Sequence, residues 1–171
     1  MIISQQQTFH RAFGTYGLYV NEGKLLVIHK KGGPYTNRFD LPGGSLEDFE
    51  TVPEALDREF QEETGLTVLQ KRALGTFEFV VHSDWHHASH LHHIGVFYKI
   101  IQTSGERTVP DKFDGQDSTG SSWVSQEQVN LDNASPLVLK AFEYLTDPET
   151  TPVMHVEDWI VKQEVASCTD M

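Results

Sequence analysis

The sequence of 171 residues predicts an α/β domain, because runs of strand-forming residues alternate with segments that have the apolar spacing of helices. The main strand runs lie at 12–20, 24–29, 68–81 and 94–101. The two helical segments are residues 52–64 and the segment that follows Ser135. A chain of this length can bury a sizeable core as one unit. We therefore expect a single domain over residues 1–171, with 148–171 as a C-terminal extension.

The charge of the chain limits its partners. The formal net charge is −12, from 25 acidic and 13 basic residues. A general nucleic-acid binder would show a basic face, so we expect no nucleic-acid polymer as a partner. A small phosphorylated substrate is compatible with this charge if metal ions neutralise the site. The alternative is that the acidic surplus only aids solubility.

The sequence also predicts the compartment. The one cysteine, Cys168, cannot form a disulfide within the chain. The first residues lack a basic start followed by a long apolar run, so no secretory signal is visible. No segment approaches the ~20 apolar residues of a membrane span. We expect a soluble cytoplasmic protein without a membrane partner.

The first elements are strands. Residues 1–11 read as a frayed or edge segment. Residues 12–20 (AFGTYGLYV) and 24–29 (KLLVIH) read as two strands of a hairpin, with Asn21-Glu22-Gly23 as its turn. Lys30-Lys31-Gly32-Gly33-Pro34 then ends the second strand, and Phe39 to Pro42 forms a short strand that enters Gly43-Gly44.

The helix at 52–64 has signals at both ends. Thr51 and Glu54 have the spacing of a capping box, and Pro53 is tolerated in a first helical turn. Gly65 can end the helix in the left-handed conformation. At ~100° per residue, Val52, Ala55 and Leu56 share one stripe, which should face the core. Glu54, Asp57 and Gln61 fall on the opposite, solvent side, and Phe60 flanks the stripe.

Glu59, Glu62 and Glu63 continue the apolar stripe, so carboxylates face inward in the last turns. Neighbours at i, i+3 and i+4 repel one another, by roughly 3 kcal/mol per pair at ~6 Å and an effective dielectric of ~20. They also lie at the negative end of the helix dipole, and Arg58 is the only cation in the helix. Clustered hard oxygen ligands suit Mg²⁺ or Mn²⁺. The alternative is a solvated acidic face.

Residues 68–81 read as a strand with a possible bend at Gly75, and residues 94–101 as another. Between them lies HSDWHHASHLHH, which holds six of the nine histidines: His82, His86, His87, His90, His92 and His93. One interpretation is a hairpin loop with exposed rings. Another is that Trp85 and one or two histidines, His92 among them, line a pocket for a base or leaving group, where aromatic rings stack. A transition-metal site is a third interpretation.

The last third of the chain reads as a polar loop at 105–122, a strand at 121–125 and a turn of helix at 126–130. Ser135-Pro136 opens a helix that should cover the sheet face opposite the first helix, or its flank. Its inner side should carry Leu137, Leu139, Ala141, Phe142 and Leu145. Residues 153–171 could pack on the core or on a second subunit, so a homodimer is an open alternative.

Nine residues around the first helix follow one fixed pattern over 23 positions: a Gly, five residues, a Glu, seven residues, then Arg-Glu-apolar-x-Glu-Glu-x-Gly-apolar. They are Gly44, Glu50, Arg58, Glu59, Phe60, Glu62, Glu63, Gly65 and Leu66. This stretch resembles the Nudix box, and a looser resemblance extends over most of 12–145. It implies an α/β/α sandwich with a mixed β-sheet and hydrolysis of a nucleoside diphosphate linked to another group X.

The resemblance also implies the roles of individual residues. Glu59, Glu62 and Glu63 would hold one to three Mg²⁺ (or Mn²⁺). The alternative role for Glu59 or Glu62 is to accept a proton from the attacking water. Arg58 would orient Glu59 and balance charge.

The family's pattern further implies a main-chain carbonyl ligand from Gly43 or Gly44. It also implies that Glu50 binds Arg58 or helps to position the box.

The resemblance implies further contacts outside the box. Lys30, Lys31 and Arg38 form a local basic cluster before the box, where the family often contacts substrate phosphates; the alternative is solvated loop charge. Some members place a further acid in the loop before a Trp-x-Ser strand, and Asp117 stands where that acid would be. The other candidates are Glu106, Asp111 and Asp114.

The substrate is less specified. Some relatives that cleave ADP-ribose carry a proline past the box, and some that cleave dinucleoside polyphosphates carry a tyrosine; residues 67–97 contain neither. This favours a nucleoside triphosphate or related nucleotide, as in the MutT-like branch, with ADP-ribose or a nucleotide sugar as the alternative. A non-catalytic nucleotide sensor is a rival. Isopentenyl diphosphate isomerase is disfavoured, because it needs a cysteine inside the site and Cys168 lies in the tail.

Overall fold

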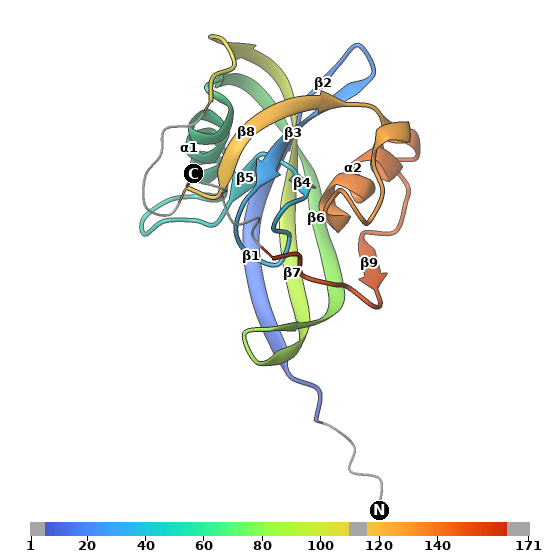
Figure 1. Cartoon of the computed structure of the whole chain (residues 1–171). Helices are drawn as coiled ribbons and strands as arrows, with labels where there is room; N and C mark the ends of the chain where they lie inside the picture. The colour runs from blue at the N-terminus through green and yellow to red at the C-terminus, as the bar shows by residue number, and fades with distance from the viewer. Residues whose placement is uncertain (1–5, 110–115, 164–171) are drawn as a thin grey trace, which may run out of the picture.

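The computed structural model describes residues 6–109 and 116–163 (Figure 1). Three residues considered above, Asp111, Asp114 and Cys168, lie outside these ranges. The strands are β1 (Phe9–Leu18), β2 (Val20–Asn21), β3 (Lys24–Lys30), β4 (Phe39–Asp40), β5 (Gly43–Gly44), β6 (Thr67–Trp85), β7 (Ala88–Ser104), β8 (Ser118–Val124) and β9 (Val153–Val156). The helices are α1 (Val52–Thr64), a short 3₁₀ helix (Gln126–Gln128) and α2 (Pro136–Thr146).

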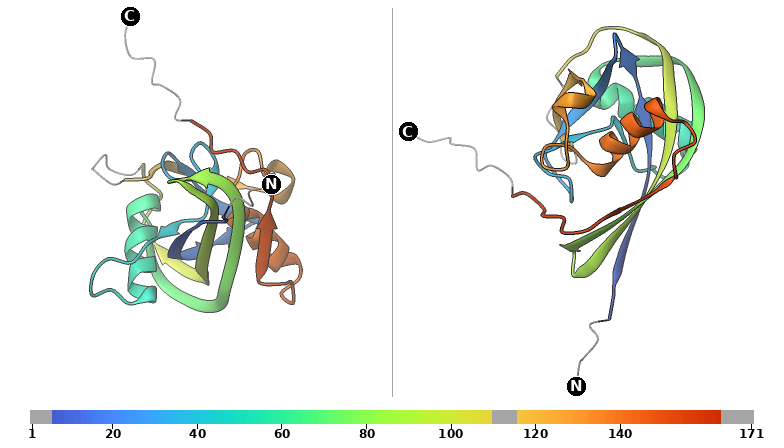
Figure 2. Two further views of the ribbon diagram at one scale, coloured as in Figure 1. Left: turned by 90° about the horizontal axis from the view of Figure 1, so that it is seen from below. Right: turned by 90° about the vertical axis from the view of Figure 1, so that its right-hand side faces the viewer.

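The strands form two sheets between the helices. The larger sheet has the order β5-β1-β7-β6-β9, and the smaller is built from β2, β3 and β4, with β8 also paired to β3. Within the larger sheet β1 runs parallel to β7 and β6 parallel to β9, while β1–β5 and β6–β7 are antiparallel. The expected mixed sheet is therefore present. Helices α1 and α2 lie on opposite sides of the strands (Figures 1 and 2).

Two cores hold these layers together. The larger combines residues from both sheets with the inner side of α2, including Val27, Phe79, Phe97 and Leu137. A smaller core lies beneath α1 and contains Leu26, Leu56, Phe60, Leu66 and Ile100. The second core fixes α1 against the strands, and so fixes the direction of the α1 carboxylates.

The expected hairpin at 12–29 was only partly correct. β1 pairs with β5 and β7, so only β2 and β3 form the hairpin. Its turn is Glu22-Gly23, with φ of 50° and 74° at the two residues. Such positive φ values match the two-residue turns that hairpins favour. The strand-forming residues of 12–20 identify a strand but carry no information about its partner.

The interpretation of the histidine-rich segment as a loop was wrong. β6 and β7 continue through it, and the turn is confined to His86-His87, with φ of 48° and 61°. Val81 and Leu91 are opposite each other and buried, and His82 is opposite His90. The period of two was present in the sequence, but the histidines obscured it because their rings can face either side. The bend expected at Gly75 is a register shift between Ala73 and Gly75.

Two further expectations need correction. β8 begins at Ser118, inside the segment 105–122 that was expected to be a loop. In α2 the inner side includes Val138 and Lys140, whereas Leu145 is exposed. Lys140 can be buried because its ammonium donates to the carbonyl of Thr151 (3.0 Å) and pairs with Glu143 (2.9 Å).

The segment that follows α2 packs on the same chain. β9 extends the larger sheet beside β6, and Trp159 is buried against Tyr35 at a ring distance of 5.7 Å. Of the two alternatives for residues 153–171, docking on the core therefore holds for the part that is described, 153–163. Among the described residues no helix is long and apolar enough to cross a membrane.

A carboxylate-lined candidate active site

Helix α1 has the predicted ends. The backbone N–H of Thr51 donates to the Glu54 carboxylate (2.8 Å), which completes the capping box, and Gly65 ends the helix with φ of 80°. Ala55, Leu56 and Phe60 are buried, as the stripe required. These contacts set the rotation of the helix, and one end of the stripe therefore presents glutamates to the interior.

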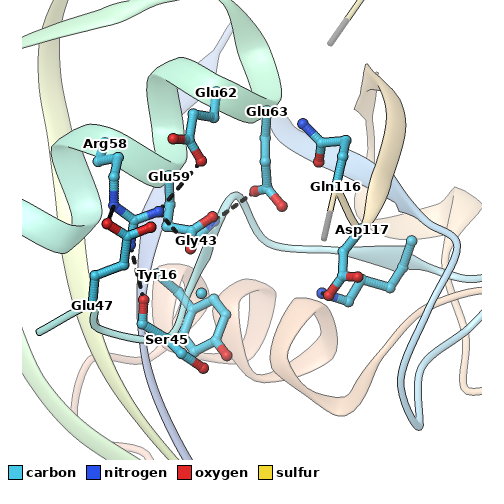
Figure 3. Close-up of a pocket in the computed structure, with 12 residues that line it drawn as sticks. Tyr16, Gly43, Ser45, Glu47, Arg58, Glu59, Glu62, Glu63, Gln116 and Asp117 are labelled. Atoms are coloured by element: carbon cyan, nitrogen blue, oxygen red, sulfur yellow. Dashed lines mark hydrogen bonds and ion pairs between the residues drawn. The ribbon is translucent and has the colours of Figure 1, made fainter. Parts of the chain in front are cut away.

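A cavity of about 390 Å³ lies between the end of α1 and the strands (Figure 3). Its lining consists of Tyr16, Lys30, Gly43, Gly44, Ser45, Glu47, Arg58, Glu59, Glu62, Glu63, Gln116 and Asp117. Figure 3 shows the three α1 glutamates on one side and Gln116 with Asp117 on the facing side. We call this space the carboxylate cavity.

Glu63 is the most buried of the three glutamates, with 2% of its surface exposed. It accepts a hydrogen bond from the backbone N–H of Gly43 (2.9 Å). Burial raises the pKa of Glu63 well above its usual value, despite the opposing effect of Lys30. Burial likewise raises the pKa of Glu59. The cavity therefore holds two buried carboxyl groups, those of Glu59 and Glu63, whose charged forms its own cations do not fully stabilise.

Arg58 connects the box residues. Its guanidinium donates to Glu50 (2.5 and 3.0 Å), to Glu59 (3.0 Å), to Glu62 (3.3 Å) and to the carbonyl of Ser45 (3.0 Å). The hydrogen bonds from Arg58 lower the pKa of Glu50 to about 2, so that Glu50 stays ionised. The expected pairing of Glu50 with Arg58 is confirmed. Arg58 thus fixes the positions of two of the cavity's carboxylates.

The facing wall is built by the end of β3 and by the two residues that precede β8, Gln116 and Asp117. The ammonium of Lys30 pairs with the carboxylate of Asp117 (3.1 Å), and the Lys31 N–H donates to the Asp117 carbonyl (2.7 Å). Beside them the side-chain carbonyl of Gln116 accepts from the Ser118 N–H (3.1 Å). The Gln116 amide nitrogen is buried and has no hydrogen-bond partner among the described residues. It is an available donor in the cavity wall.

The two glycines of β5 fit between β1 and α1. Gly43 has φ of 147°, and a Cβ there would lie 2.0 Å from the carbonyl oxygen of Thr15. A Cβ on Gly44 would lie 2.7 Å from a carboxylate oxygen of Glu59. Any side chain at Gly44 would therefore displace Glu59. The position of the Glu59 carboxylate thus requires a glycine at residue 44.

The structure brings most of the sequence-predicted site residues together. Arg58, Glu59, Glu62 and Glu63 line the carboxylate cavity with Gly43, Gly44, Lys30 and Asp117. Trp85 lines a second, smaller cavity of about 150 Å³, which we call the side cavity. The side cavity adjoins the first, because Tyr16, Lys30, Ser45 and Asp117 line both.

Three predicted substrate-binding residues lie elsewhere. Lys31 and Arg38 line a neighbouring surface pocket, which shares only Lys30 with the carboxylate cavity. Arg38 stacks over the Trp159 ring (4.0 Å to its centroid) and donates to the carbonyl of Leu131 (3.2 Å). His92 pairs with Glu78 (2.8 Å) and lines neither the carboxylate cavity nor the side cavity. The basic cluster is divided because Lys30 faces the carboxylate cavity while Arg38 packs on the C-terminal segment.

Sequence reasoning missed Tyr16, Ser45, Glu47 and Gln116, which line the carboxylate cavity. From the histidine-rich segment it singled out His92, whereas the histidine that lines the side cavity with Trp85 is His93. The sequence carried a usable signal for His93, because it shares the inward phase of Leu91 on β7. Tyr16 reaches the cavity through the pairing of β1 with β5, where it lies opposite Gly43. No local pattern reveals such a pairing.

The donor set fits a divalent cation in charge and in chemistry. The buried carboxylates are hard oxygen donors, and burial has raised the pKa of Glu63 and of Glu59. In the part of the chain that is described, no three acidic, histidine or cysteine side chains already converge at metal-ligand spacing. Arg58 holds Glu59 and Glu62, whereas Gly43 holds Glu63.

Comparison with known proteins places this geometry in context. The family model described as NUDIX domain matches residues 8–145. An ADP-ribose pyrophosphatase from Methanocaldococcus jannaschii is 43% identical over 68 residues, which cover 40% of each protein. The chain thus spans well under half the length of this relative. A protein of Bacillus subtilis named as a putative 8-oxo-dGTP diphosphatase is 29% identical over 119 residues, 69% of each protein.

Solved structures show the same fold. The crystal structure of a MutT NUDIX hydrolase from Burkholderia pseudomallei has a TM-score of 0.60 and 24% identity, and covers 78% of this chain and 97% of that one. The structure of a MutT protein from Methanosarcina mazei has a TM-score of 0.62 and 20% identity, and covers 86% and 100%. At these identities the likeness concerns the fold.

Proposed function

Because the chain belongs to the Nudix family, we propose that it is a pyrophosphohydrolase that uses Mg²⁺ or Mn²⁺. It cleaves a phosphoanhydride bond of a nucleoside diphosphate linked to another group X. The observation that carries this proposal is the pair of partly uncompensated carboxylates, Glu59 and Glu63, in a cavity that also contains Lys30. Such a site suits a diphosphate that arrives together with divalent cations.

The residues of the cavity have different proposed roles in metal binding and catalysis. Glu59, Glu62 and Glu63, with a carbonyl of Gly43 or Gly44, would hold the metal. When bound, the metal stabilises negative charge on the phosphoryl oxygens in the transition state. Arg58 keeps Glu59 and Glu62 in position through its hydrogen bonds.

Other residues act on the water and the diphosphate. Glu59 or Glu62 accepts a proton from the attacking water. Lys30 places a positive charge beside the diphosphate. The Gln116 amide nitrogen, which has no hydrogen-bond partner within 6–109 and 116–163, donates a hydrogen bond to a phosphoryl oxygen. Asp117 holds Lys30 (3.1 Å) and is a further candidate ligand.

We propose a nucleoside triphosphate or related nucleotide as the substrate, with ADP-ribose or a nucleotide sugar as the alternative. The relative named as a putative 8-oxo-dGTP diphosphatase, which aligns over 69% of both proteins, supports the first. The shorter match to a protein named ADP-ribose pyrophosphatase supports the second. The small molecule is the proposed partner in both cases.

One assay tests the function and separates the substrates. The protein is incubated with Mg²⁺ and a panel of nucleoside triphosphates, oxidised nucleoside triphosphates, ADP-ribose, sugar nucleotides and dinucleoside polyphosphates. We expect hydrolysis of at least one compound, and product analysis names the broken bond. Saturable binding without hydrolysis of any compound would support a nucleotide sensor instead.

A variant experiment tests the residues. Glu62→Gln and Glu63→Gln each remove one charge at constant volume, so we expect kcat to fall by ~10²-fold or more while the fold is kept. Glu54→Gln is a matched control, because Glu54 lies on the solvent side of the same helix and does not line the cavity. Near-normal turnover of both cavity variants with Mg²⁺ present would refute the assignment.

A further inference from the structure

Two tyrosine hydroxyls bracket one buried histidine between the two cavities. The Tyr16 hydroxyl lies 2.8 Å from Nε2 of His93, and the Tyr35 hydroxyl lies 3.1 Å from Nδ1 of the same ring. All three side chains are buried, and each has at most 7% of its surface exposed. Burial lowers the pKa of His93 to about 3, so the ring is neutral at physiological pH.

The number of hydrogens on Tyr16, His93 and Tyr35 limits which of them donate and which accept in these two hydrogen bonds. A neutral imidazole has one N–H donor and one acceptor nitrogen. With a hydroxyl at each nitrogen, one tyrosine must donate to His93 and the other must accept from it. The tyrosine that accepts keeps its own hydroxyl hydrogen for a third group. Either Tyr16 or Tyr35 therefore carries a spare donor.

The surroundings of the two hydroxyls differ. Tyr16 lines both the carboxylate cavity and the side cavity, whereas Tyr35 lines only the side cavity. A spare hydroxyl hydrogen needs an acceptor, and of the two tyrosines Tyr16 alone borders the carboxylate cavity, whose lining includes the side-chain oxygens of Glu59 and Glu63. This favours the arrangement in which Tyr35 donates to Nδ1 and Nε2–H donates to Tyr16.

We propose that the Tyr16 hydroxyl is a free hydrogen-bond donor to the substrate at the junction of the two cavities, and that His93 and Tyr35 are positioning residues that keep it free. This inference rests on the proposed function, which places the diphosphate in the carboxylate cavity. The junction is then where the diphosphate joins the rest of the substrate. A donor there takes an oxygen acceptor, such as a phosphoryl, ester or sugar oxygen, and disfavours a substrate that presents only N–H groups.

The tautomer of His93 is the direct readout. In the full chain with ¹⁵N-labelled histidine, without substrate, the ring nitrogen shifts of His93 are measured by NMR at neutral pH. The inference predicts the Nε2–H tautomer. An Nδ1–H tautomer would show that Tyr16 donates to His93 and has no spare hydrogen, and would overturn the proposal. A merely structural network has no requirement for either tautomer.

Kinetics of two matched variants test the contact with substrate. Tyr16→Phe and Tyr35→Phe each remove one hydroxyl from the same buried network, so their effects on stability should be similar. We expect Tyr16→Phe to lower kcat/KM roughly tenfold, because a hydrogen bond to a charged or polar oxygen is lost. Tyr35→Phe should cause a smaller loss, of about threefold, because the substrate-facing hydroxyl of Tyr16 remains while His93 loses the donor that favours its Nε2–H tautomer.

The outcomes separate this inference from the proposed function. Equal losses in the two variants, or a larger loss in Tyr35→Phe, would overturn the role of Tyr16 even in an active enzyme. If the wild-type chain hydrolyses no compound of the panel, the proposed function fails, and the substrate role of Tyr16 fails with it.

Discussion

At the residue scale, the balance between stability and function is clearest at Glu63. Its carboxylate is buried in a position that disfavours its charged form, and the pKa of Glu63 is therefore raised well above 4.5. Burial also raises the pKa of Asp40 and of Glu59 nearby. The chain retains these acids at a cost to the metal-free fold, which is the pattern expected of a site that binds cations.

The raised pKa of Glu63 predicts how stability depends on pH. Where the folded protein holds a proton that the unfolded chain has lost, stability decreases as pH rises. In the presence of a chelator we therefore expect the melting temperature to fall as pH rises from about 4.5 through the raised pKa of Glu63. Glu63→Gln should reduce this fall, and Mg²⁺ or Mn²⁺ should raise the melting temperature of wild type at pH 7 more than that of the variant.

Thermal melts over a series of pH values, with chelator and with metal, give the measurement. The Glu54→Gln variant should keep the slope of wild type between pH 5 and pH 7, because hydrogen bonds from Thr51 lower the pKa of Glu54 and it stays ionised over this range. Its melting temperature should be lower at every pH, since the capping box is weakened. A melting temperature of metal-free wild type that rises from pH 5 to pH 7 would contradict this account of the buried acids.

At the scale of elements, the local sequence signals of α1 were sufficient to predict where the helix begins and ends. The capping box at Thr51, the helix end at Gly65 and the apolar stripe are all contained within a few residues, and the helix bounds agree with the prediction. The strands were less predictable, because pairing joins distant residues. The two-residue turn at His86-His87 was not predicted, because the many histidines around it suggested a longer loop. The alternation of buried residues nevertheless continues in β6 and β7 on both sides of the turn.

Substitutions of the two β5 glycines should have different effects: one should lower stability and the other should lower turnover. Gly43→Ala places a side chain at φ of 147° and 2.0 Å from the carbonyl of Thr15, so it should destabilise the protein by at least ~1–3 kcal/mol. Gly44→Ala has no such positive φ but displaces Glu59. It should retain most stability and lose most of its turnover. Denaturant unfolding and kcat, measured on both variants, check this; full turnover of Gly44→Ala would contradict it.

At the scale of the whole molecule, the C-terminal segment holds the loop that follows β3. The indole N–H of Trp159 donates to the carbonyl of Pro34 (3.0 Å), and its ring packs on Arg38 and Tyr35. Tyr35 in turn contacts His93 between the cavities. The C-terminal segment is thus connected to the side cavity through the contacts of Trp159 with Tyr35 and of Tyr35 with His93.

This connection predicts the effect of removing the indole. Trp159→Ala should cost ~3–5 kcal/mol of stability, as large-to-small changes of buried aromatic residues do. It should also speed amide hydrogen exchange in residues 34–38. Ile160→Ala is the matched control, because Ile160 is 74% exposed and its loss should cost under ~0.5 kcal/mol. Equal stability of both variants would show that the tail does not brace the loop.

The sequence predicted the wall of the carboxylate cavity that α1 forms. The residues from Arg58 to Glu63 share one helix, and periodicity alone placed them together. The other wall is contributed by β1, β3, β5 and the two residues that precede β8. Tyr16 and His93, for example, are 77 positions apart and meet through sheet pairing. Arg38 was proposed for its place before the box and His92 as one of the histidines beside Trp85, but neither lines the carboxylate cavity or the side cavity.

The central claim is that the α1 glutamates hold divalent cations. The most direct test is a crystal structure of the protein with Mn²⁺ and a non-hydrolysable nucleotide, with anomalous data collected at the manganese edge. We predict a manganese peak bound by at least two of the carboxylates of Glu59, Glu62 and Glu63, next to the phosphates. Phosphates bound in the cavity without such a peak, or manganese bound only at other side chains, would contradict the account.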